Sequence, residues 1–485
     1  MSVPKLNSIV IILFGLLAAG LPAAHLLAVL VVQTWGAPVG LLAWKEVLTA
    51  GIITTQSLVL FRRRNTVSWP LAWVYALVVG LALFSSYRAQ VPLREVILGF
   101  RVELWWLLLA TTTTLWLGVI QNYLETRGAW VRTYLLVATG LGLLVVSTVS
   151  LATLWQGPVE LYSSLGVSGG WEVDQSGVLQ SPLCHSIDTV SAGCRLTGGF
   201  ATPNNFAGYL LLLLPLVIIY TKQLYRSRPL LATVGGVGLG GWLLVCIYLS
   251  FARFAYVALL AALAVGLIKA FRSRLPRNLF KVLFSTALLS PLLLLLVFLQ
   301  IGSAPIVNST LPTALTKPGS TLDHYRKTRA NWEIVRTTPG IIWTGYGLGQ
   351  AGTLAKPQYK DILSTPIVTR NLAIAEQYDI RPWELPVPEN WYLQLVLNGG
   401  GIYALLSVLL LAYPLRRLGS KHTNLFIFAL GLYAVCVGNL FLHLWENPVV
   451  STYYVLTIVW SELWAAAEET VQGSGKSEPA VYKFG

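Results

Sequence analysis

The chain has 485 residues, of which 55% are hydrophobic and only 11% are charged, whereas soluble domains carry about 25% charged residues. Many apolar runs exceed the roughly 18 residues that mark a membrane-spanning helix. These values exclude an ordinary soluble protein and predict an all-α polytopic membrane protein. The formal net charge is +14, but the basic residues are dispersed along short loops, which argues against nucleic-acid binding.

We assign about 12 transmembrane helices with loosely defined ends, at 8–33, 45–61, 69–84, 103–118, 133–155, 205–221, 231–250, 254–270, 281–301, 391–413, 424–443 and 448–466. The first run is long and contains Pro22, which favours a kink or a break. Because Lys5 precedes an apolar stretch followed by small residues, the same run also fits a signal peptide.

Lysine and arginine are unevenly distributed between the two sides that these spans define. The side that holds both termini carries 19 basic and 5 acidic residues, and the other side carries 15 of each. Because cytoplasmic loops are enriched in lysine and arginine, we expect both termini in the cytoplasm and the chain in the cytoplasmic (inner) membrane. The predicted order is helices 1–5 (1–155), a first long extracytoplasmic loop (156–204), helices 6–9 (205–301), a second long extracytoplasmic loop (302–390), helices 10–12 (391–466) and a cytoplasmic tail (467–485).

The first long loop contains Cys184 and Cys194, ten positions apart. An oxidising compartment favours a disulfide between them, and two free thiols are the alternative. The other two cysteines, Cys246 and Cys436, fall in predicted spans and are expected to behave as small apolar residues.

A polar turn, RLTGGFATPNNFAGYL, leads from this loop into the sixth span. Pro203 restricts the residue before it, and Asn204 or Asn205 can cap the new helix. A helix N-terminus attracts anions, and Arg195 lies near by in sequence. The turn therefore predicts one wall of an anion-binding site.

The span interiors are nearly free of charge, although transporters and proton pumps usually place ionisable groups near the membrane midplane. This distribution favours chemistry at the extracytoplasmic membrane surface. The charged and titratable residues near that surface include Lys45, Glu46, Glu103, Arg253, His443 and Glu446.

The second long loop contains DHYRKTRANWEIVR, which has helical spacing. One face of this predicted helix would carry Arg326, Arg329, Glu333 and Arg336. Arginine forks match phosphate oxygens, so the face is a candidate anion clamp. The alternative is a solvated charged face with Glu333 as internal partner. His324 adjoins this helix and is expected at the surface.

Two further features follow in the second loop. Gly345, Gly347 and Gly349 alternate, which predicts a tight turn where backbone could approach a ligand. Glu389 then precedes the tenth span, where it could act as a general base or simply favour the helix dipole.

Four of these elements together resemble the O-antigen ligase and O-antigen polymerase superfamily, whose members move lipid-linked glycans outside the cytoplasmic membrane. RLTGGFATPNNFAGYL looks like its Arg-x-x-Gly-x-Phe-x-x-Pro-Asn element, and LSFARFAYVALL looks like its Ser-Arg-Gly element with Arg253 in the arginine position. RKTRANW followed by TPGIIWTGYGLG resembles its second-loop arginine, proline and Gly-x-Gly. In ENWYLQLVLNGGGIY, Glu389 stands where the ligases have His, Asn398 where Glu is frequent, and Tyr403 where Gly follows.

The resemblance implies a glycosyltransferase with a polyprenyl-diphosphate-linked glycan as donor and a lipid, glycan or protein hydroxyl as acceptor. Arg253 with Arg326 or Arg329 would stabilise the leaving diphosphate, and Glu389 would accept the acceptor's proton, with inversion. The implied substrate contacts are Arg195, Asn204, Asn205, Arg336 and Asn390. We expect neither a metal nor another cofactor. A polymerase of the same superfamily and a membrane solute transporter remain alternatives.

Overall fold

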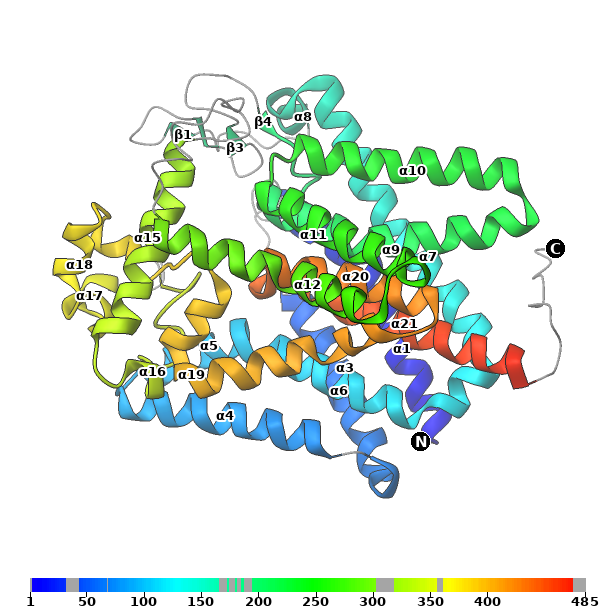
Figure 1. Ribbon diagram of the computed structural model, residues 1–485, viewed down its shortest axis with the longest axis horizontal. Helices are drawn as coiled ribbons and strands as arrows, with labels where there is room; N and C mark the ends of the chain where they lie inside the picture. Colours follow the sequence, from blue (N-terminus) through cyan, green and yellow to red (C-terminus); the bar gives the residue numbers. More distant parts are fainter. Residues whose placement is uncertain are drawn as a thin grey trace.

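The fold is described from a computed structural model of the chain (Figure 1). The described residues are 2–31, 43–67, 69–164, 194–301, 318–355 and 361–473, together with the strand residues 172–173, 179–180 and 185–186. Helices dominate this part of the chain, and the strands are short.

The first half of the chain forms helices that match the predicted spans in order. Pro22 lies in a 3₁₀ turn that separates α1 from α2, as the long first run predicted. The elements are α1 (Val3–Gly20), η1 (Leu21–Ala23), α2 (Ala24–Val29), α3 (Trp44–Arg62), η4 (Arg64–Thr66), α4 (Pro70–Arg88), α5 (Leu93–Gly99), the π-helical turn η5 (Phe100–Leu104), α6 (Trp105–Val119), α7 (Gln121–Gln156) and α8 (Pro158–Ser164).

Two short antiparallel strand pairs and four long helices follow. Strand β1 (Glu172–Val173) pairs with β2 (Leu179–Gln180), and β3 (His185–Ser186) pairs with β4 (Cys194–Arg195). The helices are α9 (Pro203–Ser227), α10 (Pro229–Leu249), α11 (Arg253–Ala270), the 3₁₀ turn η6 (Arg272–Arg274) and α12 (Arg277–Ile301).

The last third begins with small helices and returns to long ones. The arginine-rich segment is helical, as its spacing predicted. The elements are α15 (Pro318–Thr337), α16 (Ile341–Thr344), η7 (Ile362–Ser364), α17 (Pro366–Thr369), α18 (Leu372–Gln377), η8 (Pro382–Glu384), α19 (Trp391–Ala412), η9 (Tyr413–Gly419), α20 (Thr423–Gly438), η10 (Leu444–Glu446) and α21 (Pro448–Gly473).

Within the described residues, nine helices are long and apolar enough to cross a membrane. Three predicted spans, 45–61, 281–301 and 424–443, also fall on helices (α3, α12 and α20) that are not among these nine; α20 has only 16 residues. The predicted span 103–118 is different, because its helix already begins at Leu93. Glu103 therefore lies inside a membrane-length helix and not at its mouth.

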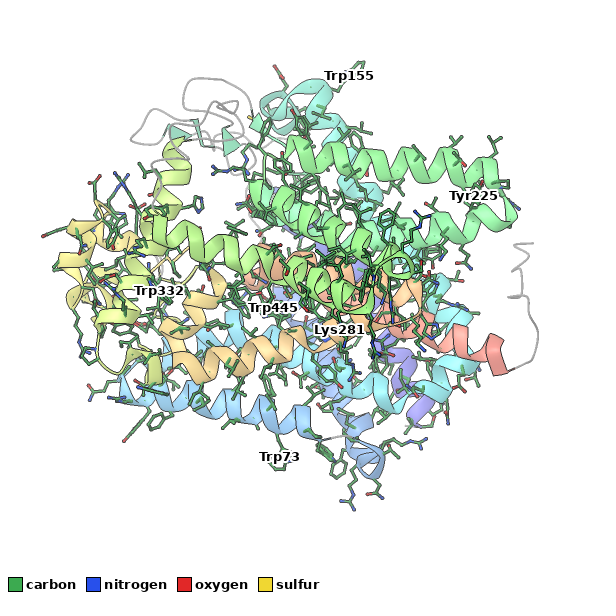
Figure 2. All side chains as sticks on the ribbon, viewed as in Figure 1. Trp73, Trp155, Tyr225, Lys281, Trp332 and Trp445 are labelled. Carbon is green, nitrogen blue, oxygen red and sulfur yellow. The ribbon has the colours of Figure 1, made fainter. Side chains whose placement is uncertain are left out.

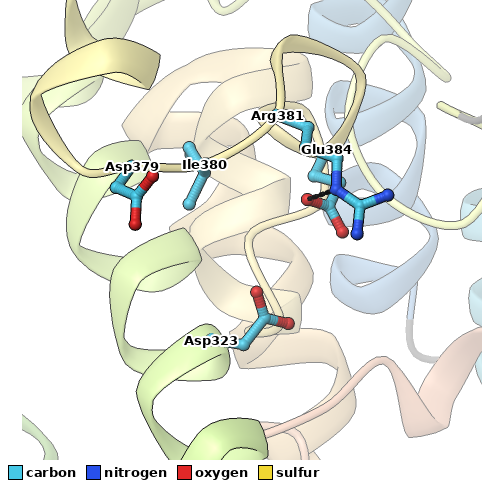
Figure 3. Close-up of a pocket in the computed structure, with 5 residues that line it drawn as sticks. All are labelled: Asp323, Asp379, Ile380, Arg381 and Glu384. Atoms are coloured by element: carbon cyan, nitrogen blue, oxygen red, sulfur yellow. Dashed lines mark ion pairs between the residues drawn. The ribbon is translucent and has the colours of Figure 1, made fainter. Parts of the chain in front are cut away.

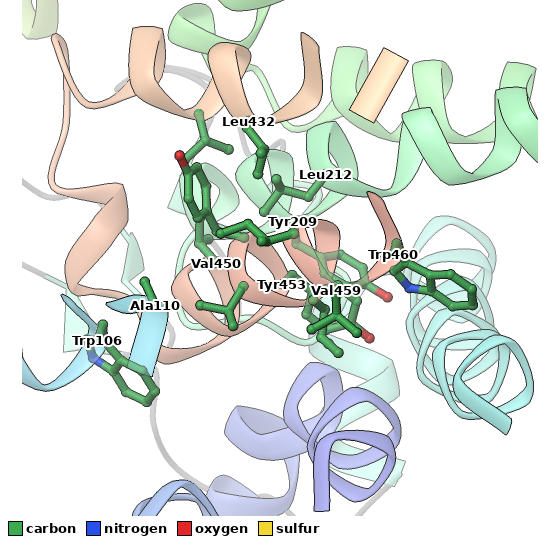
Figure 4. Close-up of a cluster of buried hydrophobic side chains, with 14 of the residues drawn as sticks. Trp106, Ala110, Tyr209, Leu212, Leu432, Val450, Tyr453, Val459 and Trp460 are labelled. Carbon is green, nitrogen blue, oxygen red and sulfur yellow. The ribbon is translucent and has the colours of Figure 1, made fainter. Parts of the chain in front are cut away.

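Helix α21 is the centre of the helical body. In its apolar window 83% of the residues are buried, against 22% in α4 and in α10, which are peripheral. Tyr209 of α9 packs edge-on against Tyr453 of α21 at 4.7 Å between ring centroids (Figure 4). Peripheral aromatic side chains such as Trp73 and Trp155 face outward (Figure 2) and are 73% and 91% exposed. A soluble protein would bury such surface, so the chain is a multi-pass membrane protein.

The described residues from α15 to η8 share a second hydrophobic core with the first turns of α19; it includes Ala330 and Ile334 of α15, Ile367 of α17 and Leu393 of α19. It lies at the left of Figure 1, opposite the end of α21. We call this end of the helical body the α15 end. Here the 194–202 segment contacts the starts of α9 and α11, and α15 contacts the residues just before α19.

The alternating glycines after α15 pack against helices and not around an open site. Gly345 has a φ of +61°, and a Cβ there would lie 2.6 Å from backbone atoms of Asn398 in α19. Gly347 has a φ of +99° and faces Ser86 of α4. The prediction of a tight turn is confirmed. The close approach, however, is to α4 and α19.

Candidate functional site

Arg195 joins three separate segments at the α15 end. Its Nε donates to the backbone oxygen of Ser250 at 2.8 Å, and its Nη2 donates to the oxygen of Phe251 at 3.1 Å and to Oδ1 of Asn204 at 3.2 Å. No hydrogen bond to Nη1 is found among the described residues. Arg195 therefore fixes the turn between α10 and α11.

Arg253 is the first residue of α11, directly after this turn. Burial and, as a smaller contribution, the positive charge of Arg253 together lower the pKa of Arg195 to about 10. The two guanidinium groups are thus close enough to repel each other, and the partners of Arg195 are neutral. Two neighbouring arginine side chains that are both partly buried favour the binding of an anion between them.

Glu389 and His324 form a second pair at the same end. Oε2 of Glu389 lies 3.5 Å from Nδ1 of His324. Burial lowers the pKa of His324 below its ordinary value; Glu389 opposes this shift and the charge of Arg253 adds to it. Arg253 therefore lies within electrostatic reach of the His324–Glu389 pair.

The backbone on both sides of Glu389 is tightly held. Thr328 of α15 donates to the oxygen of Pro388 at 2.8 Å, which ties α15 to the segment before Glu389. Asn390 caps α19 by accepting from Leu393 N–H at 2.9 Å, and it donates to the oxygen of Leu440 at 2.6 Å.

Two backbone outliers flank this group of residues. Glu389 has a φ of +51° and Phe251 a φ of +49°, a left-handed conformation that few residues other than glycine adopt. Strain of this kind concentrates at functional sites, where the surrounding structure maintains it. Phe251 precedes Arg253 by two positions, so both outliers aim the segments that carry the charged groups.

The remaining predicted residues occupy more structural positions. Arg326 pairs with Asp379 at 2.8 Å and Arg336 with Glu333 at 2.7 Å, so neither contributes to a shared arginine clamp in this arrangement. Arg329 is half-buried. Thr202, and not Asn204 or Asn205, caps α9, because its hydroxyl accepts from Asn205 N–H at 3.2 Å.

Of the cysteines, Cys194 is disulfide-bonded, whereas Cys246 and Cys436 are free. Its predicted partner, Cys184, lies outside the described residues.

A cavity of about 420 Å³ lies beside α15 (Figure 3). The residues that line it are Asp323, Asp379, Ile380, Arg381 and Glu384. Lys327 lies 2.8 Å from Asp323 and 3.1 Å from Glu384, so it joins two of the acidic walls. Asp323 precedes His324, which makes this polar cavity the neighbour of the His324–Glu389 pair.

A buried polar network that the sequence did not predict lies inside the helical body. Glu103 and Glu446 are 1% and 8% exposed. The side-chain amide of Gln394 donates to both, at 3.4 Å to Oε1 of Glu103 and at a shorter distance to Oε1 of Glu446. Asn398 also donates to Oε1 of Glu103, and the Tyr403 hydroxyl donates to its Oε2 at 3.1 Å.

The described residues contain no group of three or more His, Cys, Asp or Glu side chains that could hold a metal ion. Comparison with protein-family models, with curated proteins and with solved structures finds no match. The geometry thus stands by itself. It combines two neighbouring arginines, of which Arg195 has only neutral hydrogen-bond partners among the described residues, with a carboxylate next to a histidine. The cavity beside them has a mainly acidic lining and is not part of this combination. That combination can bind an anion and accept a proton beside it.

Proposed function

We propose that the chain is a membrane glycosyltransferase of the O-antigen ligase type, which moves a glycan from a polyprenyl-diphosphate carrier to an acceptor hydroxyl. The observation that supports this best is that Arg253 lies within electrostatic reach of both Arg195 and His324, and His324 is paired with Glu389. Arg195, Arg253 and Glu389 come from three segments far apart in the sequence, and each belongs to a different element of the resemblance.

In the proposed reaction the acceptor oxygen attacks the anomeric carbon while the bond from that carbon to the diphosphate breaks. Glu389 takes the proton of the acceptor hydroxyl, and His324 orients Glu389. Arg253, together with Arg195, stabilises the negative charge that develops on the diphosphate. A direct displacement of this kind inverts the anomeric configuration. Arg326 or Arg329 would be the second-loop arginine, and Arg326 is already paired with Asp379.

The proposal includes a topology. The α15 end would face the extracytoplasmic side of the inner membrane, with about 12 spans and both termini in the cytoplasm. The lysine and arginine excess supports this orientation. The diphosphate would then lie at the level of the lipid headgroups, next to the starts of α11 and α19.

Substitution of Arg253 tests the assignment directly. We expect Arg253→Ala to lower glycan transfer in membranes by about 10²–10³-fold, as loss of one oxyanion donor does. Arg63→Ala is the matched control, because Arg63 is exposed in the turn after α3. Glu389→Gln should lose transfer and Glu389→Asp retain part of it. Full transfer by Arg253→Ala would refute this site.

The alternatives differ in measurable ways. A polymerase of the same superfamily would use the same site with a second lipid-linked glycan as acceptor. Deletion of the gene would then leave single glycan units attached at the cell surface, whereas loss of a ligase would leave free lipid-linked chains. A solute transporter is favoured only by the buried Glu103 and Glu446. Solute uptake into proteoliposomes without any transfer of lipid-linked glycan would support it.

A further inference from the structure

In the part of the chain that the structure describes, the buried carboxyl groups of Glu103 and Glu446 contact only neutral donors. No ion pair joins either of them to Lys, Arg or His within the described residues. Their donors are all neutral: the amides of Gln394 and Asn398, the hydroxyls of Tyr403 and Thr353, and backbone N–H groups. Two buried negative charges in such surroundings would cost several kcal/mol each.

A count of donors and acceptors shows what the network lacks. Gln394 is 1% exposed, and its Oε1 has no hydrogen-bond donor. Its Nε2 faces both carboxyl groups. A protonated carboxyl could donate its O–H to Oε1 while Nε2 donates to the other carboxylate. One added hydrogen would thus complete the amide of Gln394 and remove one of the two negative charges.

We propose that Glu103 and Glu446 bind one proton between them, bridged by Gln394, as a proton-binding site with a single negative charge. The site is separate from the Arg253–Glu389 group, and the inference does not depend on the proposed glycan transfer. Gln394 lies four residues after Asn390, so the site is roughly 6 Å along α19 from its start at 1.5 Å per residue.

The bound proton links the helical body to the segment after α15. Thr353 of that segment donates its hydroxyl to Oε2 of Glu446 at 2.5 Å. Asn398 accepts from the backbone N–H of Ala351 at 2.7 Å and donates to its oxygen at 3.1 Å. A second negative charge in the network would repel the first and weaken this attachment. Protonation therefore holds the 345–355 segment against α19.

Among the described residues, the other titratable groups near the site form no ion pair with Glu103 or Glu446. Tyr403 contacts Glu103 directly, and Tyr75 of α4 donates to the oxygen of Leu104 at 3.3 Å. Glu95 of α5 accepts from Gln350 at 2.7 Å, in the same segment as Thr353. Tyr403 and Tyr75 are neutral, and the carboxylate of Glu95 disfavours a second negative charge near by. His443 stands three residues before Glu446, and within the described residues its buried ring nitrogens have no hydrogen-bond partner.

Infrared spectroscopy of the purified full chain in lipid nanodiscs tests the proposal. We expect a C=O band of a protonated carboxyl at neutral pH that shifts in heavy water. Glu103→Gln and Glu446→Gln should each lose this band. Glu462→Gln is the control, because Glu462 is paired with Arg417, and it should retain the band. If the native chain lacks the band, or if both glutamine variants keep it, the proposal is wrong.

Thermal denaturation provides a second and independent test. The proton-bound pair stabilises the fold at low and neutral pH, so the melting temperature of the native chain should fall as the pH rises into the alkaline range. In Glu103→Gln an amide replaces the acid, so the melting temperature of this variant should fall less over the same pH range. The proposal would be overturned if the melting temperature of the native chain depended on added Na⁺ or K⁺ and that of Glu103→Gln were lower at every pH. That result would show a bound cation in place of the proton.

Discussion

Arg195 offers the sharpest test of how the α15 end is built. Its three hydrogen bonds, to Ser250, Phe251 and Asn204, connect β4 to the turn between α10 and α11 and to the start of α9. Replacement by methionine keeps much of the side-chain volume and removes all three. The turn that aims Arg253 would then lose its main polar support.

The size of the effect follows from two opposing contributions. Hydrogen bonds from a charged donor contribute about 1.5–3 kcal/mol each, or about 4.5–9 kcal/mol for three if they add. Against this, the pKa of Arg195, which burial lowers to about 10, reflects an unfavourable charge energy of about 3–4 kcal/mol. Because one of the three hydrogen bonds is long, at 3.2 Å, we expect the free energy of unfolding to fall by about 2–3 kcal/mol.

The assay is denaturation of the purified full chain, combined with glycan transfer in membranes. Arg195→Met should lose about 2–3 kcal/mol of unfolding free energy and most of its transfer activity. Asn204→Ala, which removes one of the three bonds, should lose about 1 kcal/mol. If Arg195→Met were as stable as the native chain and equally active, Arg195 would not hold this turn, and the reasoning would fail.

Two further predictions concern the same end of the molecule. Thr202→Ala should destabilise the chain by about 1 kcal/mol through loss of the α9 cap, whereas Asn205→Ala should not; the reverse result in denaturation would assign the cap to asparagine. Because the pKa of His324 is lowered, its contribution to stability is present above its ordinary pKa of about 6.5 and is lost as the pH falls through the lowered value. Melting temperatures across pH should therefore drop more on acidification for the native chain than for His324→Asn, and superimposable profiles would contradict this.

The helices could be predicted because hydropathy and proline placement are local properties. The break at Pro22 and the helix at Pro318–Thr337 follow from short stretches of sequence. The start of the fourth predicted span was wrong by ten residues, because the polar residues Arg94, Glu95, Arg101 and Glu103 interrupt its hydropathy. Packing against the 345–355 segment and α19 satisfies Glu95 and Glu103, which a hydropathy count does not include.

The site was predicted only in part, for a related reason. Arg253 and Glu389 were identified through the resemblance, and the structure brings them within reach of the same histidine. His324 was expected at the surface, and its side chain is 36% exposed, but its pairing with Glu389 was not predicted. Its partner Glu389 is 65 positions away, and no local pattern connects the two. Likewise Arg326 looked available because Asp379, its partner, belongs to a distant turn.

Two residues of α19 differ from the family pattern that the sequence resembles, and both have the same physical consequence. Asn398 stands where a glutamate is frequent and Tyr403 where a glycine follows, and both side chains donate to Glu103. A glutamate at 398 would bring a third carboxyl to Glu103 and Glu446 and would remove the donor that Asn398 supplies. A glycine at 403 would remove the hydroxyl. Asn398 and Tyr403 therefore fit a network built around a buried acid. We infer that these two positions of α19 serve the proposed proton-binding site of Glu103 and Glu446 and not the proposed role of Glu389.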